Sequence, residues 1–178
     1  MSISLQHRAP DPFRWPVLSD ALVLLVDPVP TTRASTAAVL SGAGACVLQA
    51  ADGEQAMDLM CVAAMTGHPL DAVLLDVRAS QVDGWVTARR LRNEPGGRRP
   101  LLPLFALVAS DTPYARQVAE LFGATGLVAM PCVAASLCDS LGEAIDLARS
   151  VRALRRVANA PAWSSWAAND IPLNSALA

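Results

Sequence analysis

The amino-acid sequence predicts an α/β protein built on a doubly wound, five-stranded parallel sheet. Short apolar runs alternate five times with stretches of helical period, the pattern of strands joined by helical crossovers on both faces of one sheet. Two of these runs end on a carboxylate, Asp27 and Asp76. Since ligands bind at the carboxyl ends of the strands in open α/β sheets, these acids are the first candidate site residues. From the residues alone, a cap on the turn after the strand is an equally open role for Asp76.

The first two strands and helices are bounded by turn residues. The run from Ala21 to Val26 ends before Pro28, which cannot donate a ladder hydrogen bond. The Asp52-Gly53 pair is a turn signal before a stretch whose apolar residues recur every three or four positions. The predicted elements are strands over 21–26 and 46–49 and helices over 31–41, with Thr31 or Thr32 as its cap, and 54–65.

The central strand covers residues 72–75 and ends on Asp76. Its apolar run is too short for a helix and is typical of a strand buried on both faces. The Asp83-Gly84 pair then predicts a turn, followed by a helix over 85–91. Arginines cluster on the outer part of this helix and predict a solvated face. They are Arg89, Arg90 and Arg92.

The last two strands each follow the same pattern, an apolar run followed by a helix start. The predicted elements are strands over 104–108 and 127–130 and helices over 113–122, capped by Ser110-Asp111, and from Ser136 to about residue 158. The last helix is longer than it needs to be to cover the sheet. The part that extends past the sheet must bury its apolar stripe elsewhere. Self-association is the favoured role, an acidic partner the second and simple solvated charge the third. The arginines at this end of the helix are Arg149, Arg152, Arg155 and Arg156.

Composition argues against several classes of function. The 178 residues are 53% hydrophobic, which predicts a packed domain, but the apolar runs are too short to cross a bilayer. Charges and prolines stand where a secretory signal needs an apolar core, so a cytoplasmic protein is expected. A net charge of −2 provides no overall positive electrostatic field that would attract nucleic acid. The four cysteines lack metal-ligand spacing and predict buried reduced thiols. No GxGxxG or P-loop follows the first strand, which argues against a nucleotide-binding enzyme.

The expected organisation is an irregular leader over residues 1–19, a domain over 20–149 whose last helix extends to about 158, and a tail over 159–178. The tail is too short for a DNA-binding or enzymatic output domain. It contains Trp163 and Trp166, which suggest docking on this domain or on a partner.

Several short motifs, taken together, resemble one family. They are Val26-Asp27, Leu74 to Val77, Asp83-Gly84, Ala106 to Ala109 and Pro131. The set resembles the bacterial response-regulator receiver (CheY-like) domain over roughly residues 20–149. The resemblance implies a flavodoxin-like sheet with strand order 2-1-3-4-5. It also implies that Asp76 is the phosphoacceptor of a His-to-Asp phosphorelay and that Asp27 is the first of an acidic pair that helps to hold Mg²⁺.

The chain departs from the family pattern at the positions that stabilise charge. Where the family has a second acid, a hydroxyl, an aromatic switch and a lysine, this chain has Pro28, Val108, Leu127 and Met130, and Ser80 replaces a common proline. No lysine occurs anywhere in the chain. One preorganised contact to developing charge is typically worth about 3 to 4 kcal/mol. These departures therefore predict a weakened or lost Mg²⁺ site at Asp27 and Asp76 and slow or absent phosphorylation.

Arg78 follows Asp76 by two positions and has two interpretations. The favoured one is a solvent-facing loop arginine. The alternative is that its guanidinium swings over the site and supplies the missing cation.

The sequence therefore predicts a stand-alone, degenerate receiver, a pseudo-receiver that is not an enzyme. It would act in two-component signalling by protein–protein contact through the surface around its fourth helix, fifth strand and fifth helix, independently of phosphorylation. Its partners would be a histidine kinase, a phosphotransfer protein or a downstream target, with a homodimer through the last helix. The alternative is a working phosphoacceptor that uses Asp76, with Arg78 in place of the lost cations.

Overall fold

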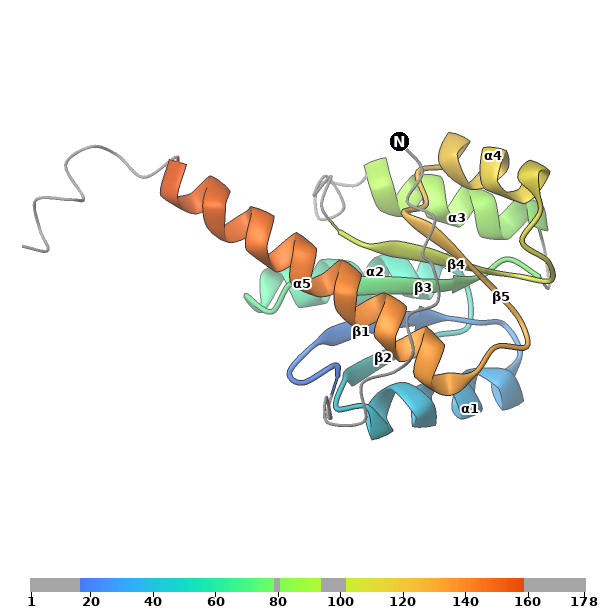
Figure 1. Ribbon diagram of the computed structural model, residues 1–178, viewed down its shortest axis with the longest axis horizontal. Helices are drawn as coiled ribbons and strands as arrows, with labels where there is room; N and C mark the ends of the chain where they lie inside the picture. The colour runs from blue at the N-terminus through green and yellow to red at the C-terminus, as the bar shows by residue number, and fades with distance from the viewer. Residues whose placement is uncertain (1–16, 79–80, 94–101, 159–178) are drawn as a thin grey trace, which may run out of the picture.

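The computed structural model of the chain describes residues 17–78, 81–93 and 102–158 (Figure 1). Most of the predicted leader, the predicted tail with its two tryptophans, and Ser80 lie outside these ranges. Strands and helices alternate, and the predicted strands agree with the observed ones within one residue at each end. The elements are β1 (Leu22–Val26), α1 (Pro30–Gly42), β2 (Cys46–Ala50), α2 (Gly53–Met65), β3 (Ala72–Asp76), α3 (Gln81–Asn93), β4 (Leu104–Val108), α4 (Pro113–Leu121), β5 (Gly126–Ala129) and α5 (Ala134–Ala158).

The five strands form one parallel sheet in the order β2-β1-β3-β4-β5, which confirms the predicted fold class. β1 and β3 are neighbours, with Val26 paired to Leu75. Because all strands run the same way, their carboxyl ends share one edge of the sheet. Asp27, directly after β1, and Asp76, the last residue of β3, are therefore brought to the same place.

Two hydrophobic clusters, one on each face of the sheet, form the core. Successive strand residues point to opposite faces, so Leu24 joins one cluster and its neighbours Val23 and Leu25 join the other. Helices α1 and α5 cover one face, and α2, α3 and α4 cover the other (Figure 1). β5 is left at the edge of the sheet, with all four of its residues only partly buried.

The starts of two helices correct the sequence prediction. α1 begins with Val29 as its N-cap residue and Pro30 in its first turn, and no side chain caps it, so neither Thr31 nor Thr32 has the predicted role. Proline suits this position because the first helical N–H groups have no partner in the helix. In α4 the cap is Thr112, whose hydroxyl accepts a hydrogen bond from the N–H of Ala115 at 3.1 Å. The predicted cap residue Asp111 is instead paired with Arg116.

The predicted turn at Asp83-Gly84 is also wrong, because both residues lie inside the first turns of α3, which begins at Gln81. Gly84 has a packing role there. A Cβ atom at this position would lie 2.8 Å from the Cγ1 atom of Val77 and 2.9 Å from its Cα atom. The glycine thus lets α3 approach the chain that leaves β3, close to Asp76.

Arg92 does not lie on a solvated face, although Arg89 and Arg90 on the same helix are exposed as predicted. Its Nε donates to the carbonyl of Gly123 at 2.7 Å, its Nη1 to the carbonyl of Leu102 at 2.5 Å and its Nη2 to Oγ1 of Thr125 at 2.8 Å. Burial lowers the pKa of Arg92. This arginine therefore joins α3 to the segments that flank β4 and β5.

The cysteines are free, as predicted, but only one of them is fully buried. Cys46 and Cys61 are exposed and Cys132 is half-buried, so the prediction of buried thiols holds for Cys138 alone. Burial raises the pKa of the Cys138 thiol to about 11, which keeps it protonated at neutral pH.

Helix α5 is held to the sheet by a charged group at the amino-terminal ends of the strands, opposite the end at which Asp76 lies. Both carboxylate oxygens of Asp71 accept hydrogen bonds from Arg149, at 3.2 and 2.8 Å, and one of them also accepts the N–H of Leu22. The hydrogen bond with Asp71 raises the pKa of Arg149. Beyond this anchor the C-terminal part of α5 projects past the sheet (Figure 1), and Leu154 on it is 69% exposed. Among the described helices, none combines the length and apolar character that a bilayer crossing requires.

Candidate functional site

The candidate site lies at the carboxyl ends of β1 and β3. Asp27 is completely buried and Asp76 is 5% exposed. A buried carboxylate is costly unless hydrogen bonds or a counter-ion compensate for the lost water. The partners of these two acids therefore decide what the site can do.

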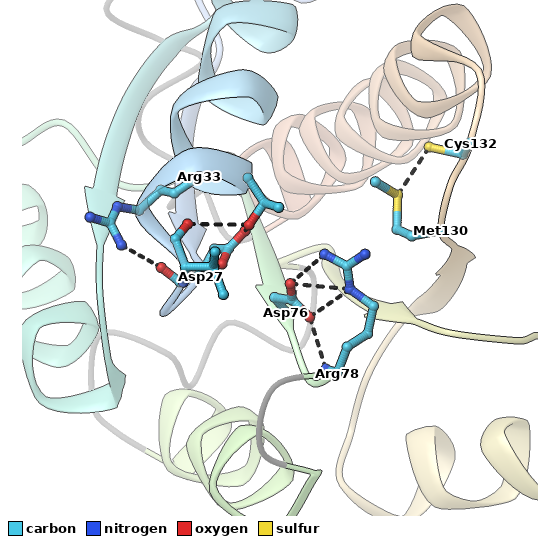
Figure 2. Close-up of polar contacts among 8 residues, drawn as sticks. Asp27, Arg33, Asp76, Arg78, Met130 and Cys132 are labelled. Atoms are coloured by element: carbon cyan, nitrogen blue, oxygen red, sulfur yellow. Dashed lines mark hydrogen bonds and ion pairs between the residues drawn. The ribbon is translucent and has the colours of Figure 1, made fainter.

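Arg78 supplies the compensation for Asp76, and Figure 2 shows its guanidinium folded back over the carboxylate. Its Nε lies 2.9 Å from Oδ1 and 3.2 Å from Oδ2, its Nη2 lies 2.5 Å from Oδ2, and its backbone N–H donates to Oδ1 at 2.8 Å. These hydrogen bonds raise the pKa of Arg78. The favoured interpretation of Arg78 as a solvent-facing loop arginine is therefore wrong, and Asp76 is held as one half of an internal ion pair.

Asp27 is held by the start of α1. Its Oδ1 accepts the N–H of Val29 at 2.8 Å, and its Oδ2 accepts the hydroxyl of Thr32 at 2.5 Å. The Nη1 of Arg33 donates to the main-chain carbonyl of Asp27 at 2.6 Å. Pro28, at the position of the family's second acid, is exposed and carries neither a carboxylate nor an N–H group. The loop after β1 thus fixes one acid and provides no second one.

The remaining candidate positions carry apolar side chains. Val108 ends β4 and is buried, and Leu127 in β5 packs against the core. Met130 follows β5, and its N–H donates to the carbonyl of Val108 at 2.8 Å. The Sγ atom of Cys132 lies 3.3 Å from the Sδ atom of Met130, with Arg78 between this pair and Asp27 in the view of Figure 2. A hydroxyl or an amine is absent from all three positions.

Sequence reasoning missed Thr32 and Arg33 as partners of Asp27. Thr32 was assigned to a cap, and the sequence signal for its real role is its spacing from the acid: it falls in the first turn of the helix that directly follows β1. Cys132 was treated only as a thiol, yet it contacts Met130 at the site edge. Among the described residues, no group of three or more His, Cys, Asp or Glu side chains is suited to hold a metal ion.

Comparison with known proteins agrees with this fold. The family model of the response regulator receiver domain matches residues 23–142. The sensory/regulatory protein RpfC of Xanthomonas campestris pv. campestris is 33% identical over 132 residues, which are 74% of this chain and 17% of RpfC. The gliding motility regulatory protein of Myxococcus xanthus is 34% identical over 90 residues, which are 50% of this chain and 11% of that protein. The chain therefore spans less than a fifth of the length of these curated relatives.

Solved structures show the same architecture. The chemotaxis protein CheY4 of Vibrio cholerae is 25% identical, with a TM-score of 0.61 over 71% of this chain and 99% of CheY4. The receiver domain of the sensor histidine kinase PA1611 from Pseudomonas aeruginosa PAO1 is 29% identical, with a TM-score of 0.58 over 72% of this chain and 99% of that domain, and carries a magnesium ion in its active-site cleft. With its sheet order, its acids at the ends of β1 and β3, and a family match over most of its length, this chain belongs to the response regulator receiver domains of two-component signalling.

Proposed function

We propose that this receiver is a pseudo-receiver, which acts in two-component signalling by binding other proteins and does not depend on phosphorylation of Asp76. The observation that carries the proposal is the chemical character of the groups around Asp76. Val108 and Met130 stand where the family's hydroxyl and lysine would contact a phosphoryl group, and both are apolar. A phosphoryl group on Asp76 would therefore find neither a hydrogen-bond donor nor a mobile cation at these two positions.

The proposal includes a lost magnesium site, because the groups around the acids of this chain leave no place for the ion. Mg²⁺ takes an octahedron of oxygen ligands, usually one or two carboxylates with waters. Here Pro28 brings no carboxylate, and the guanidinium of Arg78 lies against both oxygens of Asp76. A divalent ion beside Asp76 would compete with this resident positive charge.

A second candidate function keeps Asp76 as a working phosphoacceptor. The observation that favours it is the position of Arg78, which places a cation within hydrogen-bond distance of Asp76. We rank it second because the guanidinium contacts the attacking oxygens of Asp76 themselves, so it must leave them before it can stabilise a transferred phosphoryl group.

The surface proposed to meet a partner is formed by α4, the edge strand β5 and α5. Tyr114 and Leu121 are two helical turns apart on α4 and are 73% and 78% exposed. Exposed apolar side chains that share a helix face are typical of protein–protein contacts. The partners we propose for this surface are a histidine kinase, a phosphotransfer protein or a downstream target, and we propose no catalytic role for the domain.

The test of this function separates the acceptor from the surface. In cells that carry the gene, Asp76→Asn is expected to leave the signalling output at the wild-type level, whereas the double variant Tyr114→Glu/Leu121→Glu is expected to match a gene deletion. Met65→Glu, a charge placed on an 86% exposed apolar residue of α2, is the control and should behave as the wild type. An Asp76→Asn phenotype equal to the deletion would support the phosphoacceptor function instead.

We also propose that α5 contributes to a homodimer. Leu147 and Leu154 are one heptad apart on its outer face and are 59% and 69% exposed, outside the stripe that packs on the sheet. In light scattering the double variant Leu147→Glu/Leu154→Glu should have half the mass of the wild-type protein, while Met65→Glu keeps the wild-type mass. A wild-type protein that is monomeric at high concentration would exclude this interface.

A further inference from the structure

We propose that the guanidinium of Arg78 is the resident cation of the site and that it shuts divalent metal ions out of the carboxylate pair formed by Asp27 and Asp76. The inference deepens the proposed function, on whose lost magnesium site it rests, by naming Arg78 as the cause of the loss. Its test measures ion binding by the isolated chain and involves neither a partner nor a phosphodonor, so its failure can be told apart from a failure of the proposed signalling role. It reverses the alternative role that the sequence offered for Arg78: the side chain would block ion binding and would not help phosphoryl transfer.

The first argument is geometric. The fork of Arg78 spans both oxygens of Asp76, through Nε and Nη2, and is fixed further by the backbone N–H of the same residue. A guanidinium that meets a carboxylate through two of its nitrogens gives the strongest type of protein ion pair. A metal ion at Asp76 would have to displace this side chain, because both cannot contact the same oxygens.

The second argument concerns electrostatics and solvent access. The side chain of Asp76 is 2% exposed, whereas that of Arg78 is 28% exposed, so the arginine lies on the solvent side of the acid. In Figure 2 the guanidinium of Arg78 lies over the carboxylate of Asp76. A divalent ion that approaches Asp76 from the solvent must therefore first displace the positive charge of Arg78.

The third argument is that the acids keep acceptor capacity once Arg78 is removed. A carboxylate has about four lone-pair sites. In Asp27 the N–H of Val29 and the hydroxyl of Thr32 each use one, and in Asp76 the backbone N–H of residue 78 uses one. Two buried carboxylates with free lone pairs and no counter-ion form a site for a hard cation completed by water.

The test is a titration of the full chain with Mn²⁺, a hard divalent ion whose free form is counted by electron paramagnetic resonance. Arg78→Gln keeps a polar side chain, shorter than that of arginine, and removes its charge. The variant should bind Mn²⁺ about tenfold more tightly than the wild type, the scale on which neighbours of a ligand change metal affinity. The double variant Arg78→Gln/Asp76→Asn should lose this gain. Arg116→Gln, which breaks the exposed pair with Asp111, is the matched control and should leave Mn²⁺ binding unchanged.

Thermal unfolding provides a second measurement. Because Arg78→Gln leaves Asp76 without a counter-ion, the variant should be less stable than the wild type, and Mn²⁺ should raise its Tm but not that of the wild type. A variant that folds only when Mn²⁺ is present would also support the proposal. Equal Mn²⁺ affinity of the wild type and Arg78→Gln, or a variant that stays unfolded at every Mn²⁺ concentration, would overturn it.

Discussion

Incubation of the protein with acetyl phosphate and Mg²⁺ is expected to leave its intact mass unchanged. CheY4 of Vibrio cholerae, incubated in parallel under the same conditions, is the comparison protein. The reason is the loss of charge stabilisation at the oxygens of a transferred phosphoryl group. One preorganised donor at such a position is typically worth about 10²–10³ in rate. Val108 and Met130 remove two such groups, and the ion pair with Arg78 occupies the nucleophile as well.

The phosphorylation measurement is intact-mass spectrometry on the wild type beside Asp76→Asn. Both proteins should show one unmodified mass at all times, and a phosphoryl adduct that forms on the wild type and is absent from Asp76→Asn would contradict the expectation. Such an adduct would place Arg78 at the centre of the chemistry. Repeating the assay with Val108→Thr/Met130→Lys tests the cause, because this variant restores both missing groups and should gain labelling if their loss is what prevents it.

The fold could be predicted from the sequence because its signals are local. Each strand is an apolar run bounded by proline, glycine or an acid, and the period of the pattern changes from strand to helix at these boundaries. The central runs, β3 and β4, are buried throughout, and helical connections between parallel strands then leave few topologies. The errors are at helix starts such as that of α3, where the Asp83-Gly84 pair has the composition of a turn but lies in the helix because Gly84 packs against Val77.

The candidate site could be located from sequence but its state could not. The positions of Asp27 and Asp76 follow from strand ends, which are local features. The direction of a long side chain is not local: Arg78 has several rotamers, and only the buried charge of Asp76 selects the one that folds back over the carboxylate. A loop arginine beside an acid therefore cannot be assigned to solvent from its position in the chain.

Arg92 shows the same limit in a residue that has no part in the site. Its helical spacing put it with Arg89 and Arg90 on an outer face, but in the structure it is half-buried and hydrogen-bonded to three acceptors. The carbonyl groups of Leu102 and Gly123 lie 10 and 31 residues further along the chain, beyond the end of the helix, so the helical pattern around Arg92 does not mark them as partners. Burial lowers the pKa of this arginine, yet the guanidinium stays charged at neutral pH.

Arg92→Ala is expected to lower the free energy of unfolding by about 3 kcal/mol, because hydrogen bonds from a charged donor contribute roughly 1.5–3 kcal/mol each and do not add fully. The variant leaves the carbonyls of Gly123 and Leu102 without this donor. It also removes one hydrogen bond from Thr125, whose Oγ1 accepts hydrogen bonds from both Arg92 and the N–H of Leu104 at the start of β4. We therefore expect the loss of stability to be greatest where α3, β4 and the turn before β5 meet.

Urea denaturation of Arg92→Ala beside Arg89→Ala measures this effect. Arg89 is exposed on the same helix, so its replacement should change the free energy of unfolding by no more than about 0.5 kcal/mol. Arg92→Met, whose unbranched apolar side chain replaces the methylene groups of arginine, separates packing from hydrogen bonding. Its free energy of unfolding should remain close to that of Arg92→Ala if the hydrogen bonds to the three acceptors provide the stability. Recovery of wild-type stability in Arg92→Met would show instead that the methylene groups of Arg92, which lie against Gly123, hold α3 in place.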